Sequence, residues 1–87
     1  MKNNKNSIVS IIKRWNCEAG TDGVILLDAY PTVNESIRII TDSPEVLIGK
    51  NMSLFYKYST ILKSEYPSLK EITFIDARYF CKATMKI

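Results

Sequence analysis

Two segments of this chain repeat their apolar residues every three to four positions, and this spacing predicts two helices that each bury one face. Residues 7–17 carry the first repeat, and residues 52–65 carry the second, which Pro67 ends. The apolar positions are Ile8, Ile11, Ile12 and Trp15 in the first segment and Leu54, Tyr58, Ile61 and Leu62 in the second. Any fold proposed for the chain must give both helices a surface to pack on.

Short extended runs lie between the two predicted helices. Residues 24–30 predict one strand, residues 36–41 a second, and residues 45–48 a third. The turn sequence Asp42-Ser43-Pro44 separates the last two runs. We therefore expect the second and third strands to form a hairpin.

A longer extended run closes the chain. Residues 71–86 alternate in side-chain character, and residues 76–78 predict a bend or bulge within the run. The predicted order is α-β-β-β-α-β, which favours an α+β fold with a small mixed or antiparallel sheet and two helices. A chain of 87 residues has room for one domain, so we expect residues 1–87 to form it, with residues 1–6 as a flexible tail.

The composition removes several kinds of chemistry. The chain has no histidine, which excludes catalytic triads and dyads that use one. Cys17 and Cys81 lie far apart in the sequence, which favours two buried free thiols over a disulfide and argues against a zinc site. We expect no metal, no cofactor and no enzymatic activity. No apolar run is long enough to span a membrane and no secretory signal pattern is present, so the chain as given is expected to be cytoplasmic.

Acidic and glycine-rich clusters offer only weak signs of chemistry. Asp22 with Asp28, or Asp42 with Glu45, could in principle serve as acid–base pairs, but acids at turns and strand ends are usually solvated or capping groups. The sequence Gly20-Thr21-Asp22-Gly23 lacks the lysine and the preceding strand of a phosphate-binding loop. It is interpreted as a connection between a helix and a strand.

Charge and aromatic residues are unevenly distributed along the chain. Residues 1–14 hold four cations and no acid, residues 15–45 hold six acids and one cation, and residues 46–87 hold seven cations and three acids. The last of these segments also holds seven of the nine aromatic residues. Its candidate binding residues are Tyr56, Arg78, Tyr79, Phe80, Lys82 and Lys86. Cations interleaved with rings are typical of single-stranded nucleic-acid binding, and exposed aromatic residues are typical of protein interfaces. A third interpretation is that these aromatic rings pack in the core.

The end of the chain resembles a known family. Residues 75–79 read Ile-Asp-Ala-Arg-Tyr and follow a predicted hairpin and a helix. This arrangement is similar to the end of the extracytoplasmic β domain of the FtsQ/DivIB bacterial cell-division family, across residues 36–87. Ala77 replaces the leucine usual in that motif. The resemblance implies a non-catalytic scaffold that binds proteins near residues 75–87, and an extracytoplasmic location if the chain is an excised domain.

These observations lead to one hypothesis and one alternative. The hypothesis is a small protein-interaction module. It is either a division-scaffold-like domain or a protein of a phage or mobile element that inhibits a host protein stoichiometrically. The alternative is a nucleic-acid-binding domain that uses the basic and aromatic C-terminal strand. The free edge of so small a sheet also offers a route to a homodimer.

Overall fold

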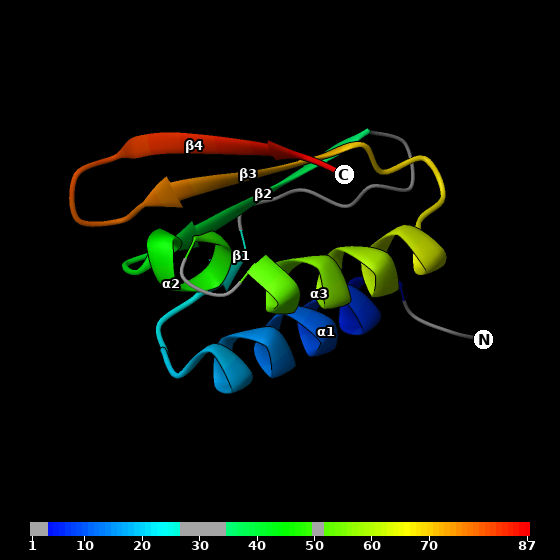
Figure 1. The fold of residues 1–87 in the computed structure, drawn as a ribbon, viewed down its shortest axis with the longest axis horizontal. Coiled ribbons are helices and arrows are strands. Elements are labelled where there is room, and N and C mark those ends of the chain that lie inside the picture. Colours follow the sequence, from blue (N-terminus) through cyan, green and yellow to red (C-terminus); the bar gives the residue numbers. More distant parts are fainter. Residues whose placement is uncertain (1–3, 27–34, 50–51) are drawn as a thin grey trace.

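The helices lie together on one face of a four-stranded sheet in the computed structural model of the chain (Figure 1). The structure describes residues 4–26, 35–49 and 52–87. The elements in chain order are α1 (Asn4–Ala19), β1 (Ile25–Leu26), β2 (Ser36–Thr41), α2 (Pro44–Ile48), α3 (Met52–Glu65), β3 (Glu71–Asp76) and β4 (Cys81–Lys86).

The sheet is mixed, with the strand order β1-β2-β3-β4. Strands β2 and β3 pair in parallel over their full length, whereas β1 pairs with β2, and β3 with β4, in antiparallel fashion. Two parallel neighbours need a crossover connection, which α2 and α3 supply. The expected α+β class and small mixed sheet are confirmed.

Alternation along β2 and β3 determines which face the helices cover. Ile37 and Ile39 of β2, and Ile72 and Phe74 of β3, are fully buried in the core that the sheet shares with the helices. The residues between them point to the opposite face, because successive side chains of a strand alternate. Residues paired across two strands share a face, so Lys82, Thr84 and Lys86 of β4 point away from the helices. Side chains of one strand thus belong to two separate surfaces.

Trp15 is the centre of the hydrophobic core. Its indole is fully buried and stacks on the ring of Tyr58 at a centroid distance of 5.7 Å. Phe74 meets it edge-on at 5.8 Å from the sheet, and Phe55 lies 6.0 Å away on α3. The indole therefore joins α1, α3 and β3, which are distant in the sequence.

The expected third strand is wrong, and with it the expected hairpin and element order. Residues 45–48 belong to α2, whose first position is Pro44. Proline suits the first turn of a helix, because its φ angle is preset and it has no N–H to leave unpaired. The Ser43 carbonyl accepts hydrogen bonds from the amides of Val46 and Leu47, which closes a helical turn. Consequently β2 has no hairpin partner after it and pairs with β3 instead.

The other expected elements are largely present. Helices are confirmed in both segments, with α1 extended at each end, so residues 4–6 are helical rather than part of a tail. The first expected strand is found as Ile25–Leu26, and residues 27–30 lie outside the described residues. The bend in the final run is a turn over residues 77–80 that separates β3 from β4. In the part of the chain that the structure describes, no helix is long and apolar enough to cross a membrane.

Acid is expected to destabilise the fold, partly through Glu18 of α1. The Tyr58 hydroxyl and the Lys57 ammonium hydrogen-bond to the Glu18 carboxylate and hold its pKa below the usual range. Glu18 thus contributes stability above its unfolded pKa, about 4.3, and loses it as the pH falls through the lower folded value. Denaturant unfolding at about pH 6 and about pH 3 should show a smaller loss for Glu18→Gln than for the native chain. Equal losses in both proteins would contradict this role for Glu18.

Candidate functional site

The turn between β3 and β4 carries the two most exposed large hydrophobic side chains of the described residues. Tyr79 is 68% exposed and Phe80 is 79% exposed. Folded proteins rarely leave the aromatic rings of two successive residues in water without a reason, and exposed aromatic residues mark interaction sites. We call residues 77–80 the hairpin tip.

Backbone hydrogen bonds close the hairpin tip tightly. The Asp76 carbonyl accepts the amides of Tyr79 at 3.1 Å and of Phe80 at 2.5 Å. The Ala77 amide donates to the Thr41 carbonyl at 2.8 Å, which ties the start of the turn to β2. The tip is therefore a closed loop anchored on the sheet.

The Asp76 side chain reinforces this loop. Its carboxylate is only 12% exposed and accepts the Arg78 amide and Arg78 Nε on Oδ1, both at 2.9 Å. Its Oδ2 accepts Arg78 Nη2 at 2.8 Å. The Arg78 guanidinium holds the pKa of Asp76 below its usual range. The same guanidinium lies 3.9 Å from Glu45 Oε1 of α2 and 5.2 Å from the centre of the Tyr79 ring.

Phe80 adopts a left-handed backbone conformation, with φ at +57°. Glycine or asparagine normally occupies such a position, because a bulky side chain there is strained. Backbone strain of this kind often accompanies function. Here it presents an aromatic ring where most turns have none.

The outer edge of β4 is the second feature next to the tip. Antiparallel pairs alternate between residues that exchange hydrogen bonds and residues that do not. The Ile87 amide donates to the Lys70 carbonyl at 2.8 Å, which assigns the hydrogen-bonded positions of β4 to Cys81, Ala83 and Met85. The backbone groups of Lys82, Thr84 and Lys86 therefore point outward, away from β3. They form an edge that can pair with another strand.

The structure gathers four of the six predicted site residues and separates the other two. Arg78, Tyr79 and Phe80 form the tip, and Lys82 follows it on β4. Lys86 lies at the far end of β4, about 14 Å along the strand from Lys82, where it faces Glu71 at 3.8 Å. Tyr56 is 61% exposed on α3, in the helical layer.

The sequence prediction missed the role of Asp76. The sequence indicates Asp76 only as part of the predicted bend and of the Ile-Asp-Ala-Arg-Tyr motif, although an aspartate two positions before a turn residue often accepts that residue's backbone amide. This pattern was the available signal. Arg78 is predicted to bind a partner, and in the structure its guanidinium is hydrogen-bonded to Asp76.

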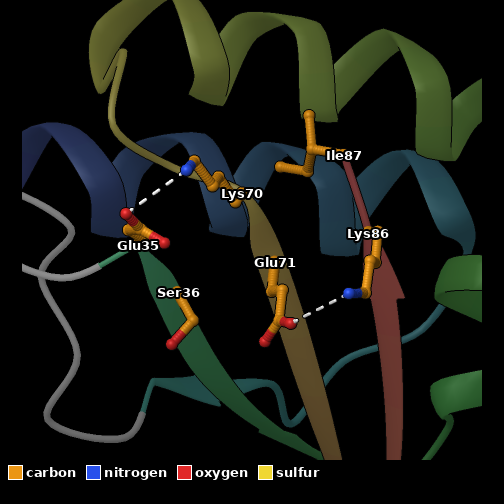
Figure 2. Close-up of a pocket in the computed structure, with 6 residues that line it drawn as sticks. All are labelled: Glu35, Ser36, Lys70, Glu71, Lys86 and Ile87. Carbon is orange, nitrogen blue, oxygen red and sulfur yellow. Dashed lines mark ion pairs between the residues drawn. The ribbon is translucent and has the colours of Figure 1, made fainter.

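A shallow cavity of about 470 Å³ lies at the other end of the sheet (Figure 2). It is lined by Glu35, Ser36, Lys70, Glu71, Lys86 and Ile87. Lys70 pairs with Glu35 at 3.3 Å, and Lys86 pairs with Glu71 at 3.8 Å. The four charges thus pair within the cavity rather than converge on a common point. We assign no chemistry to this cavity.

The remaining candidates of the sequence also gather no reactive group. Cys17 and Cys81 are free, as expected, but exposed rather than buried, because one lies late in α1 and the other begins the edge strand. No three potential ligands among residues 4–26, 35–49 and 52–87 could hold a metal ion. A side chain at Gly23 would contact the Asp42 carboxylate, which disfavours a phosphate at this loop. Asp28 lies outside the described residues.

Comparisons of the chain with known protein families, with curated proteins and with solved structures found no match.

Proposed function

We propose that this chain is a small, non-catalytic protein-interaction module that binds its partner through the hairpin β3–β4. The observation that carries the proposal is the pair of adjacent exposed rings, Tyr79 and Phe80, on a turn closed by hydrogen bonds. Aromatic anchors held in place contribute most to protein interfaces, because little conformational entropy is lost when they are buried.

The free edge of β4 complements these rings. An extended segment of a partner can add to the sheet through the outward backbone groups of Lys82, Thr84 and Lys86. Strand β4 has the sequence Cys-Lys-Ala-Thr-Met-Lys, with two cations and no acid. A partner segment with acidic side chains opposite the lysines would suit this edge.

A homodimer through the same edge is less favoured. Antiparallel pairing of two β4 strands about Thr84 would place Lys82 opposite Lys86 of the second copy. Like charges directly opposite each other destabilise a pair of strands. We therefore favour a different protein as the partner, in keeping with either a division-scaffold-like domain or a stoichiometric inhibitor of a host protein.

Nucleic acid remains the alternative, but the ion pairs of the surface favour protein. Arg78 is bound by Asp76, and Lys86 faces Glu71. A phosphate would have to displace these carboxylates to reach the guanidinium or the ammonium. Nucleic-acid binding depends strongly on cations that are free to neutralise phosphates.

The test is capture of a partner from a lysate of the source cells by the immobilised chain, with and without nuclease. We expect one protein at stoichiometric amounts that survives nuclease and is lost with Tyr79→Ala. Tyr56→Ala is the matched control, because it removes the same ring from a comparably exposed site in the helical layer. Retention that disappears with nuclease would favour the nucleic-acid alternative, and equal loss with both variants would contradict the assignment to the tip.

A proline at Thr84 should weaken partner binding without unfolding the chain. The Thr84 amide points outward, so Thr84→Pro removes a donor from the free edge and leaves the hydrogen bonds to β3 in place. Thr84→Val is the control, since it keeps the amide and removes only the hydroxyl, which lies 3.4 Å from that of Thr73. We expect at least about a tenfold loss of affinity for the proline variant only. Unchanged affinity in a folded Thr84→Pro chain would rule out strand addition at this edge.

A further inference from the structure

We propose that Asp76 and Arg78 are positioning residues of the hairpin tip, and that Arg78 acts on the partner only through Asp76. Their ion pair holds Phe80 in its left-handed conformation and keeps both aromatic rings in a fixed arrangement. The inference rests on the proposed function, since it concerns how the same surface is prepared for binding.

Asp76 accepts hydrogen bonds through both its side chain and its main chain. Its carboxylate accepts one backbone and two side-chain donors of Arg78, at 2.8 to 2.9 Å. Its carbonyl accepts the amides of Tyr79 and Phe80. The side chain and the main chain of Asp76 thus together restrain the backbone of residues 78–80.

The backbone of Phe80 is strained in this turn. A left-handed φ of +57° disfavours a phenylalanine, so an isolated loop of this sequence would prefer other conformations. Such a conformation persists only where the surroundings determine it. The hydrogen bonds to Asp76 are the restraint that the structure shows for this turn.

The ion pair of Asp76 and Arg78 is anchored on three neighbouring elements. Asp76 ends β3 and pairs with Thr41 of β2 and Cys81 of β4. The Arg78 guanidinium also reaches Glu45 of α2 at 3.9 Å and lies over the Tyr79 ring at 5.2 Å. Movement of the guanidinium would therefore release the aromatic ring and the contact with α2 together.

The free protein tests the positioning role first. Asp76→Asn removes the charge, and Arg78→Lys removes the two-point geometry, while Lys82→Ala is a control beside the tip. We expect amide hydrogen exchange of Tyr79 and Phe80 to accelerate about tenfold in the first two variants and to be unchanged in the control. The three-bond amide–Hα coupling of Phe80 should shift toward the average of a mobile loop. Unchanged exchange at both amides, or acceleration spread evenly over β3, would overturn the inference.

A double-mutant cycle tests whether Arg78 also contacts the partner. The probe is the protein that the native chain retains in the capture experiment. We expect Asp76→Asn and Arg78→Lys each to weaken its binding about tenfold, and the double variant to bind no more weakly than either single variant. Losses that add would show a direct contact of Arg78 and overturn the inference. Failure of the proposed function is distinguishable, because the exchange measurements need no partner.

Discussion

Replacement of Trp15 with alanine is expected to remove most of the free energy of unfolding of the chain at 25 °C. Removal of a fully buried large ring costs about 3–5 kcal/mol, because apolar burial is lost and a cavity remains. A small domain has about 5 kcal/mol of stability in total, so the variant would have little left. The indole contacts rings on α3 and β3, so both the helical layer and its contact with the sheet should fail together.

Trp15→Phe keeps an aromatic ring at this position but removes the indole and its N–H group. The indole N–H is buried and has no hydrogen-bond partner among the described residues, so phenylalanine removes an unfavourable group as well as contacts. We expect Trp15→Phe to cost clearly less than Trp15→Ala in urea unfolding followed by circular dichroism. An alanine variant with near-native stability would contradict the central place given to this residue.

The second large effect concerns the hairpin tip. The double variant Tyr79→Ala, Phe80→Ala should bind the captured partner at least about 100-fold more weakly, since anchor residues of interfaces contribute about 2 kcal/mol or more each. Both rings are exposed, so the free energy of unfolding should change by no more than about 0.5 kcal/mol. Isothermal titration calorimetry measures the affinity, and urea unfolding measures the stability.

The matched control for this experiment is the double variant Met52→Ala, Tyr56→Ala. It removes two exposed apolar side chains of similar total size from α3. We expect native affinity for this control. Weaker binding by the control than by the tip variant would move the interface to the helical layer.

The sequence predicted best where one physical pattern dominates. Trp15 and Leu62 follow the spacing of a helix, and both are fully buried in helices at the expected places. The interruption of alternation after Asp76 marks a real break in the final run, but this break is the turn of a hairpin rather than a bend within one strand.

Short segments were predicted poorly, since their structure depends on the neighbours they meet. Residues 45–48 are apolar enough for a strand, but Pro44 starts a helical turn that buries Leu47 against the core. The parallel pairing of β2 with β3 could not be read from either strand, because it depends on the crossover between them. Contacts between distant segments leave little local signal.

The candidate site was predicted in composition but not in arrangement. Tyr79 and Phe80 were identified as exposed binding residues only as one of several readings, and their exposure depends on the turn that places them at the end of the hairpin. The sequence groups Lys86 and Tyr56 with them, although the length of β4 places Lys86 at its far end and Tyr56 lies in the helical layer. The sequence does not reveal that Asp76 holds the turn, because this effect depends on hydrogen bonds that form only in the folded hairpin.

The most direct test of the protein-binding assignment is amide chemical-shift mapping of the isotope-labelled chain titrated with its captured partner. We expect the largest changes at the amides of residues 78–84, which cover the hairpin tip and the start of the free edge, and small changes in α1 and α3. Changes confined to the helices, with the amides of Tyr79 and Phe80 unaffected, would contradict the assignment of the binding surface to the hairpin β3–β4.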